Sequence, residues 1–222
     1  MNWKNTDKIA VVTGSAGIGF GVAQKLISEG FCVVLCGNSE VDNAKARNAT
    51  KGKPIQVIDL DVSDETAVQS FVTKLNGVID GLDALINCAG FQTYGNIETT
   101  TPKAWRNVID INLTGYFLMA HFLYPLLKSR RTASIVNIAS VQGHLNQNNV
   151  LGYATSKGAI HAFTRALAVD CAKDNIRVNS ISPGSIRTPL LEFSATELTE
   201  PGSNVEETLS SFGESHPIKR IG

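Results

Sequence analysis

Short apolar runs alternate along this chain with longer segments in which apolar residues recur at helical spacing. The short runs have the length and β-branched content of buried strands, and they occupy residues 8–13, 32–36, 54–58, 84–88, 135–139 and 176–181. The longer segments are expected to be helices and cover residues 18–29, 64–76, 102–128 and 154–172. This alternation predicts an α/β fold with a doubly wound parallel sheet, for which 3-2-1-4-5-6 is the expected strand order.

Two of the expected helices are apolar over most of their circumference. Apolar residues of the helix at 102–128 include Ile109 and Phe117, and those of the helix at 154–172 include Ile160 and Val169. A helix that is apolar all round is buried on more than one side. We therefore expect one side of each helix to pack on the sheet and the other side to pack on a second subunit.

Composition and charge narrow the class of protein. With 222 residues, the chain is long enough for one domain with a sizeable core, which we expect to span 1–222. Basic and acidic residues number 20 each, so charge does not favour a nucleic-acid partner or an anionic membrane surface. No run approaches the ~20 apolar residues of a membrane span, and residues 1–8 lack the apolar core of a signal peptide.

The cysteines point to a reducing compartment. Cys32, Cys36, Cys88 and Cys171 have no C-x-x-C spacing, and three of them fall in expected strands. Such cysteines are small buried hydrophobes more often than disulfide partners or metal ligands. We therefore expect a cytoplasmic protein without a bound metal.

A glycine-rich turn separates the first expected strand from the first expected helix. It reads Gly14-Ser15-Ala16-Gly17-Ile18-Gly19. Glycines let backbone N–H groups come close to a pyrophosphate, and the N-terminus of the helix that follows adds positive partial charge. Strand, turn and helix together predict a dinucleotide site that includes Gly14, Ser15, Gly17, Ile18 and Gly19.

A tyrosine and a lysine lie four residues apart at the start of the helix expected at 154–172. At that spacing, Tyr153 and Lys157 leave the same face of a helix. A phenol titrates near pH ~10, and a neighbouring cation favours the phenolate and lowers that pKa. Tyr153 is therefore a candidate proton donor or acceptor, and Ser140, at the end of the preceding strand, is placed to hold a reacting oxygen.

The order Ser140, then Tyr153 thirteen positions later, then Lys157 four further on resembles the signature of the short-chain dehydrogenase/reductase family, whose fold is Rossmann-like. The resemblance implies an NAD(P)-dependent oxidoreductase that interconverts a secondary alcohol and a ketone or aldehyde. Tyr153 would exchange the proton, Lys157 would lower the pKa of Tyr153 and bond the nicotinamide ribose, and Ser140 would stabilise the developing oxygen charge. Asn112, in I-N-L-T-G, would position a water that links Lys157 to solvent. A solvated asparagine within a helix is the alternative.

Two further matches imply contacts with the adenosine half of the cofactor. Asp61, in D-V-S-D, resembles the family aspartate that bonds the adenine amino group, and Val62 follows it. The alternative for Asp61 is a turn or N-cap acid before the helix at 64–76. Asn87-Cys88-Ala89-Gly90 resembles the family's N-N-A-G. There Asn87 is expected to hold the central strands together, and Asn87, Ala89 and Gly90 are expected to line the site.

The segment after the last expected strand resembles the family turn P-G-x-x-x-T. Its Pro183, Gly184, Ile186 and Thr188 are expected to hold the nicotinamide carboxamide. Residues 190–217 are polar and irregular in pattern, and in the family this region is a mobile lid over the substrate. Family members continue beyond a motif like residues 216–222 with one more helix and an edge strand. We therefore expect this sequence to lack both elements and to leave the strand at 176–181 with an exposed edge.

The sequence departs from the family pattern in the glycine-rich turn, and it does not distinguish NAD from NADP as the cofactor. The family has T-G-x-x-x-G-x-G, whereas the turn from Thr13 to Gly19 is one residue shorter, so we expect an effect on cofactor affinity and not on the fold. An acid at the end of the strand at 32–36 would select NAD, and an arginine just after it would receive the 2′-phosphate of NADP. Asn38 supplies neither, and Ser15 or Ser39 could bond a 2′-phosphate, so NAD and NADP both remain open.

The partners follow from the resemblance, and two functions compete. The expected partners are a small-molecule alcohol or carbonyl substrate and a second subunit, in a homodimer or homotetramer through the helices at 102–128 and 153–172. The alternative is a non-catalytic or truncated member of the family that acts by association. Residues that could line the substrate pocket are Tyr94, Gln142, His144, Asn146, Gln147, Leu190 and Leu191. The polar loop after Gln142 hints at a sugar or polyol, although an ordinary solvated loop has the same composition.

Overall fold

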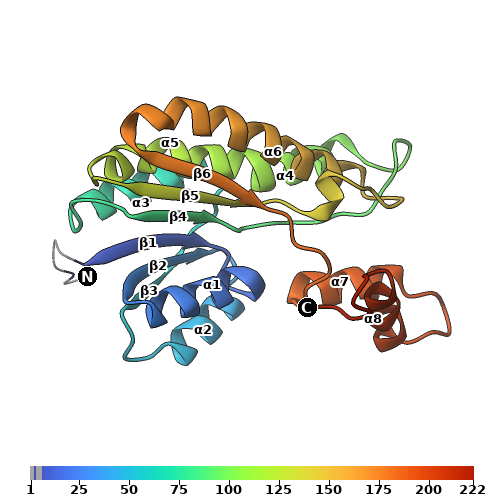
Figure 1. Ribbon diagram of the computed structural model, residues 1–222. Coiled ribbons are helices and arrows are strands. Elements are labelled where there is room, and N and C mark those ends of the chain that lie inside the picture. Colours follow the sequence, from blue (N-terminus) through green and yellow to red (C-terminus); the bar gives the residue numbers. More distant parts are fainter. Residues whose placement is uncertain (1–2, 4–6) are drawn as a thin grey trace.

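The strands form one parallel sheet. The computed structural model describes Trp3 and residues 7–222, so the prediction about a signal peptide lies largely outside the described residues. Within them, the strands are β1 (Lys8–Thr13), β2 (Phe31–Gly37), β3 (Ile55–Asp59), β4 (Ala84–Asn87), β5 (Ala133–Ile138) and β6 (Ile176–Ile181). Their order is β3-β2-β1-β4-β5-β6 (Figure 1), which confirms the predicted doubly wound topology and makes β6 an edge strand.

Helices cover both faces of the sheet. In Figure 1, α1 (Gly17–Ser28) and α2 (Glu40–Ala49) lie below the sheet. The opposite face carries α3 (Glu65–Asn76), α4 (Pro102–Ile109), α5 (Gly115–Lys128) and α6 (Leu151–Cys171). α2 was not expected from the sequence, because its residues EVDNAKARNA have little apolar periodicity. This helix is instead capped by the Ser39 side chain, which accepts a hydrogen bond from the backbone N–H of Asp42.

Two apolar cores explain why the central strands are apolar without interruption. Successive side chains of a strand point to opposite faces of the sheet. Ile9 and Val11 of β1 belong to the core that α3 and α5 cover. Ala10 and Val12 belong to the core under α1 and α2. Each face of β1 is therefore buried, as is typical of a parallel sheet covered by helices on both sides.

The long helix expected at 102–128 is interrupted by a wider turn. It begins at α4, with Thr101 as its N-cap and Pro102 in its first turn. A π-helical segment at Asp110–Thr114 follows, and α5 continues from Gly115. Such π-helical turns are rare and often occur at functional sites. Asn112 lies in the middle of this segment.

Buried asparagines join the central strands. Asn87, the last residue of β4, donates from Nδ2 to Asn137 Oδ1 of β5 at 2.9 Å. Asn137 in turn donates from Nδ2 to Thr164 Oγ1 of α6 at 3.0 Å. Asn87 therefore links the central strands as expected, and Asn137 extends the link to the helix that carries Tyr153.

The region expected to be irregular at 190–217 contains two helices, so that part of the prediction is wrong. They are α7 (Pro189–Leu198) and α8 (Val205–Glu214), which lie together beyond the carboxyl ends of the strands (Figure 1). Both begin at side-chain caps, Thr188 for α7 and Asn204 for α8. Their apolar residues form no long stripe, because they cover a cavity rim and not a sheet face.

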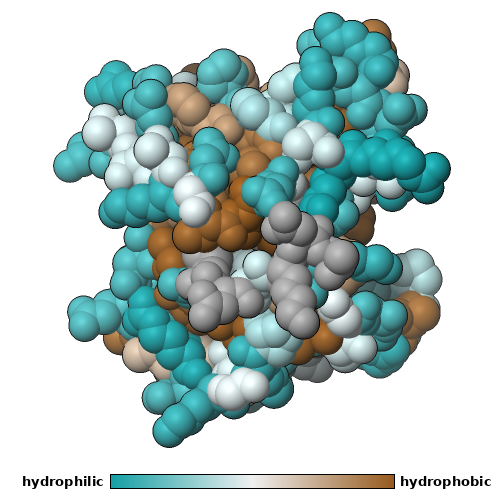
Figure 2. Space-filling view, turned by 90° about the vertical axis from the view of Figure 1, so that its left-hand side faces the viewer, coloured by the Kyte–Doolittle hydropathy of each residue, from teal (hydrophilic) through white to brown (hydrophobic). Residues whose placement is uncertain are grey.

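The end of the molecule away from α7 and α8 carries both apolar and hydrophilic side chains on its surface (Figure 2). Figure 2 shows this end, where an apolar zone is framed by hydrophilic side chains.

No helix of the described residues is long and apolar enough to cross a membrane. The structure describes all four cysteines, and each is a free thiol; Cys32, Cys36 and Cys171 are buried.

Candidate active site

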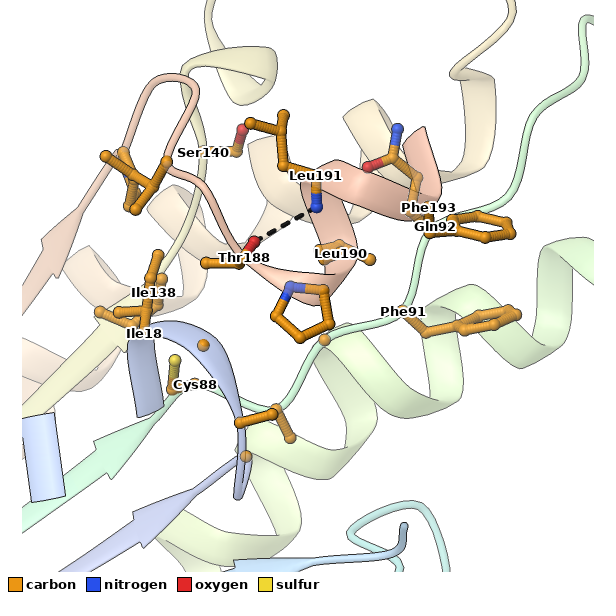
Figure 3. A pocket seen from close by; sticks show the side chains of 18 of the residues that line it. Ile18, Cys88, Phe91, Gln92, Ile138, Ser140, Thr188, Leu190, Leu191 and Phe193 are labelled. Carbon is orange, nitrogen blue, oxygen red and sulfur yellow. Dashed lines mark hydrogen bonds between the residues drawn. The ribbon is translucent and has the colours of Figure 1, made fainter. Parts of the chain in front are cut away.

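A cavity of about 520 Å³ opens at the carboxyl ends of the strands. Its walls come from segments that follow all six strands and from α7 (Figure 3). Most of the predicted site residues line it: Gly14, Ser15, Gly17, Ile18, Asn38, Asp61, Val62, Ala89, Gly90, Ser140, Tyr153, Lys157, Pro183, Gly184, Ile186 and Thr188. The topology therefore brings together residues that lie as far apart in the sequence as Gly14 and Thr188.

Three predicted site residues do not line the cavity. Asn87 and Asn112 are fully buried, at 0 % exposure, and act through other residues. Asn87 therefore joins strands but does not line the adenosine side as expected. Gly19 lies in the first turn of α1. Its part in the site is to allow close packing of the turn.

The glycine-rich turn has the backbone shape that a pyrophosphate site requires. Gly14 has φ +91°, a conformation that other residues rarely adopt. A side chain on Gly19 would overlap the backbone oxygen of Gly14 and come within 2.9 Å of that of Thr13. Ala16, the N-cap of α1, offers no capping side chain, so the first N–H groups of α1 remain available to an anion. These features fit the pyrophosphate of a dinucleotide.

The shortened turn places Ser15 deep in the site. Ser15 is 7 % exposed, and a side chain on Gly37, at the end of β2, would overlap the Ser15 hydroxyl. The shortened turn therefore packs against the end of β2 through Ser15. The fold of β1, turn and α1 is intact, as expected from the sequence.

The wall at β2 and β3 contains two carboxylates. Asp42 and Asp61 both line the cavity. Asp61 Oδ1 accepts hydrogen bonds from the backbone N–H and the hydroxyl of Ser63, at 2.9 and 2.6 Å. Asp64, not Asp61, caps α3, so Asp61 is not an N-cap, and its bonds to Ser63 lie in the turn before the helix. Asp61 remains exposed to the cavity, where it could also meet an adenine.

Tyr153 and Lys157 leave α6 on the face that meets the end of β5. Tyr153 is 7 % exposed and Lys157 is 3 % exposed. Lys157 Nζ donates to the backbone oxygen of Ile138 at 2.8 Å and lies 5.6 Å from the centroid of the Tyr153 ring. Burial lowers the pKa of Lys157 from 10.5 to about 8, with the Cys88 thiol acting in the opposite direction.

The expected lowering of the Tyr153 pKa is not found. Burial raises the pKa of Tyr153 above its usual value of 10, and a hydrogen bond with the Ser140 side chain opposes that rise. Lys157 is directed at the Ile138 carbonyl oxygen, so desolvation outweighs any effect of its charge on the phenol. Ser140 Oγ accepts from the backbone N–H of Gln142 at 3.1 Å, which fixes this hydroxyl at the end of β5.

Asn112 is committed to the backbone of the neighbouring strand end. Its Oδ1 accepts from the N–H of Phe91 at 2.7 Å, and its Nδ2 donates to the oxygen of Phe91 at 2.9 Å and to Ser156 Oγ at 3.0 Å. A solvated asparagine is therefore excluded. The π-helical turn places Asn112 beside the segment that follows β4. This segment passes close to Lys157, since a side chain on Gly90 would lie 3.7 Å from Lys157 Nζ and 3.9 Å from Asn112 Oδ1. Asn112 therefore fixes the backbone next to Lys157.

The turn after β6 forms the opposite wall. Its Pro183 oxygen accepts from the N–H of Val141 at 3.1 Å, which ties it to the segment that follows Ser140. The N–H of Ser185 donates to His216 Nε2 at 3.2 Å. Thr188 ends the turn and caps α7 through the N–H of Leu191 (Figure 3). One continuous segment therefore connects the cavity wall to the helices over it.

Five of the seven predicted substrate residues line the cavity: Tyr94, Gln142, Gln147, Leu190 and Leu191. The other two do not. The ring of His144 packs on that of His161, with centroids 4.1 Å apart, and Asn146 lines a separate cavity of about 370 Å³. The described residues contain no group of three or more His, Cys, Asp or Glu side chains that could hold a metal.

Sequence reasoning missed several lining residues, notably Asp42, Phe91, Gln92, Phe193, Ser194 and Phe212. Phe91 and Gln92 directly follow Asn-Cys-Ala-Gly at the carboxyl end of β4, so the rule that sites lie at strand ends would have found them. Phe193, Ser194 and Phe212 lie on α7 and α8, and the N-caps Thr188 and Asn204 are the sequence signals that could have located these helices.

Comparisons with known proteins agree with this geometry. A family model described as short chain dehydrogenase matches residues 8–198. L-fucose dehydrogenase of Mus musculus is 33 % identical over 218 residues, which cover 97 % of this chain and 77 % of that protein.

Solved structures are similar over nearly the whole chain. The ligand-free aldohexose dehydrogenase of Thermoplasma acidophilum has a TM-score of 0.87 at 32 % identity, over 97 % of this chain and 82 % of that one. The L-sorbose reductase of Gluconobacter frateurii, complexed with NADPH and L-sorbose, has a TM-score of 0.90 at 30 % identity, over 100 % of this chain and 87 % of that one. The chain therefore belongs to the short-chain dehydrogenase/reductase family, NAD(P)-dependent oxidoreductases that act on CH–OH groups of small molecules.

Proposed function

We propose that this protein interconverts a secondary alcohol and a carbonyl compound with Tyr153 as the acid/base. The observation that carries the proposal is the meeting of Ser140, Tyr153 and Lys157 at the cavity that the glycine-rich turn also lines. When bound, NAD(P)H supplies a hydride to the carbonyl carbon. The chain supplies the proton and the groups that hold the substrate oxygen.

Each of the three side chains has a distinct task. Burial keeps the Tyr153 phenol protonated, which suits the donation of a proton to the substrate oxygen during carbonyl reduction. Ser140 Oγ is held by the hydrogen bond that it accepts from the N–H of Gln142, and its own hydrogen, which here meets the Tyr153 side chain, would turn to the charge that develops on the substrate oxygen. Lys157 uses one N–H on Ile138 and retains others for a ribose hydroxyl and a proton path.

Asn112 is a positioning residue in this proposal. It holds both backbone groups of Phe91, next to Gly90, so it sets the distance between this strand end and Lys157. A water bonded near Lys157 would complete a path to solvent. One observation favours a competing function, that of a non-catalytic family member that acts by association. Ser15 of the shortened turn occupies space beside the end of β2, the strand end at which the cofactor's ribose would bind.

We further propose that residues 190–217 act as a lid and that α4, α5 and α6 form a subunit interface. The lid proposal rests on α7, whose Leu190, Leu191 and Ser194 line the cavity. The interface proposal rests on large apolar side chains left exposed on these helices. Phe117 of α5 is 49 % exposed and Val169 of α6 is 77 % exposed.

The first test replaces the proposed acid/base. Tyr153→Phe removes the phenolic hydroxyl and keeps the ring, so we expect loss of turnover with NADH or NADPH while the dissociation constant of the cofactor is nearly unchanged. Turnover and nicotinamide fluorescence measure the two effects separately. Undiminished turnover in the variant would contradict the assignment, and failure of the wild type to bind either cofactor would favour the non-catalytic function.

A further inference from the structure

A chain of hydrogen bonds connects the segment after β4 to α7 at one end of the cavity. Gln92 Nε2 donates to Tyr94 Oη at 2.9 Å. The Gln92 oxygen lies 3.5 Å from Ser194 Oγ, which donates to the backbone oxygen of Leu190 at 2.9 Å. Figure 3 shows Gln92 with Phe193 at this end of the pocket, away from Ile18 and Cys88.

Gln92 retains hydrogen-bonding capacity that the described chain does not use. A glutamine amide has two N–H donors and an oxygen with two lone pairs. One N–H goes to Tyr94. The oxygen lies 3.5 Å from Ser194 Oγ, but the single hydrogen of that hydroxyl is directed at Leu190 over the shorter distance. One donor and one acceptor of Gln92 are therefore left for a ligand, although the residue is only 7 % exposed.

This pair of groups matches a hydroxyl. An alcohol can donate its hydrogen to Gln92 Oε1 and accept from the free N–H at the same time. A buried polar group without a partner is costly, so a ligand that supplies the missing hydrogen bonds gains affinity over one that does not. An aliphatic ketone of the same size would leave the second N–H of Gln92 and the second lone pair of its oxygen unused.

The contacts of Gln92 indicate where that hydroxyl lies on the substrate. Gln92 donates to the hydroxyl of Tyr94, and Tyr94 packs against the apolar cluster that contains Tyr153. We therefore expect the hydroxyl that Gln92 binds to lie on the side of the substrate near the carbon on which Tyr153 acts.

The charge of the cavity does not favour acidic substrates. Among the cavity-lining residues, which all lie in the described part of the chain, the charged side chains are Asp42, Asp61 and Lys157. Arg187, at the base of the lid, is paired with Glu206 and Glu192. The one cation of this described lining, Lys157, is assigned above to the nicotinamide ribose, so a phosphate or carboxylate on the substrate would lack a cation of its own. Phe91, Leu190 and Leu191 instead offer apolar surface to C–H groups.

We propose that the substrate is a neutral polyhydroxy compound, a sugar or polyol, and that Gln92, which is held by Tyr94 and lies against Ser194, binds a hydroxyl beside the reacting carbon. The inference rests on the proposed function and specifies its substrate class. It rests on the hydrogen bonds of Gln92 and not on the polar loop after Gln142.

The test compares substrates that differ by one hydroxyl. D-glucose and 2-deoxy-D-glucose are oxidised, and acetoin and 2-butanone are reduced, by the wild type and Gln92→Leu. We expect the wild type to prefer the hydroxylated member of at least one pair. In Gln92→Leu, kcat/KM for that member should fall about 10- to 100-fold, while kcat/KM for its partner is unchanged. Gln69→Leu, at an exposed position of α3, is the matched control and should behave as the wild type.

The outcomes separate the two proposals. If the protein turns over these substrates and Gln92→Leu leaves the ratio of kcat/KM between the hydroxylated member and its partner unchanged, the inference is overturned and the proposed function stands. No turnover of any substrate with NADH or NADPH, by folded protein, overturns the proposed function and the inference with it. If Gln92→Leu does not fold, Tyr94→Phe takes its place. It removes the hydroxyl that accepts from the Gln92 amide, so the preference in kcat/KM for the hydroxylated substrate over its partner should become smaller.

Discussion

At the scale of single residues, the site depends on two buried groups with shifted ionisation. Lys157 is almost fully buried beside the Ile138 carbonyl oxygen, and burial lowers its pKa to about 8. Tyr153 is buried beside it, and burial raises its pKa. The sequence spacing predicted that these side chains meet. It did not predict the direction of the Tyr153 shift, because desolvation depends on atoms from β5 and the segment after β4.

The Lys157 shift makes a prediction about stability. Because its folded pKa of about 8 lies below its ordinary value of 10.5, the unfolded chain binds more protons between these pH values. The penalty for burying the charge is complete below about pH 8 and vanishes above 10.5.

Unfolding of the wild type and of Lys157→Met should therefore be compared across this range with chemical denaturant. Other titrating groups are common to both proteins, so their effects cancel in the difference. We expect the unfolding free energy of the wild type to rise relative to that of Lys157→Met as the pH increases from 8 to 10.5. A pH-independent difference would show that Lys157 is not desolvated.

Gln92 shows where residue-level prediction from sequence ends. Ser140, Tyr153 and Lys157 are recognisable because their spacing along the chain is tied to one strand end and one helix. The role of Gln92 depends on Ser194, a residue 102 positions away in sequence. No local pattern contains that contact.

At the scale of elements, the β1–turn–α1 unit is the part that the sequence predicts best. The strand at Lys8–Thr13 was predicted with the bounds it has, and α1 begins one residue earlier than expected. The glycines explain this success, because each has a local steric reason. The helices α2, α7 and α8 were missed, since short capped helices with weak apolar periodicity owe their stability to tertiary packing.

Two glycines of α1 offer a matched pair of substitutions. In Gly19→Ala, the new side chain would overlap the Gly14 carbonyl oxygen, so we expect a loss of about 1–3 kcal/mol in stability and a weaker binding of NAD(P)H. In Gly21→Ala, the new side chain meets nothing within 4 Å. That variant should gain about 0.5–1 kcal/mol, because alanine favours a helix over glycine.

Thermal unfolding and nicotinamide fluorescence measure both variants. Equal effects of the two substitutions would contradict the claim that the turn packs tightly on α1. Retained cofactor affinity in a folded Gly19→Ala variant would show that the shape of this turn does not determine binding.

At the scale of the whole molecule, the strand order was predictable and the surface was not. Alternating strands and helices lead to the order β3-β2-β1-β4-β5-β6 by general rules of chain connection. The sequence indicated that the helices now seen as α5 and α6 are apolar on two sides. The exposed Phe117 and Val169 are what remains of that second side after the sheet is covered.

The proposed subunit interface predicts a change of assembly. Val169→Glu places a charge on the exposed side of α6 and should convert an oligomer into a monomer in analytical ultracentrifugation. Val41→Glu is the control, since Val41 is 64 % exposed on α2, away from the proposed interface. A wild type that is monomeric at all concentrations, or a Val169→Glu variant that assembles like the wild type, would contradict the interface.

If this cavity carries out hydride transfer with Tyr153 as the proton donor, the fate of the nicotinamide hydrogen shows it. The protein is incubated with a carbonyl substrate and NADH or NADPH that carries deuterium at both positions of nicotinamide C4. We expect deuterium on the carbinol carbon of the product with the wild type, and none above background with Tyr153→Phe, although both proteins bind the cofactor. Cofactor binding by the wild type without deuterium transfer to any alcohol product would contradict this mechanism.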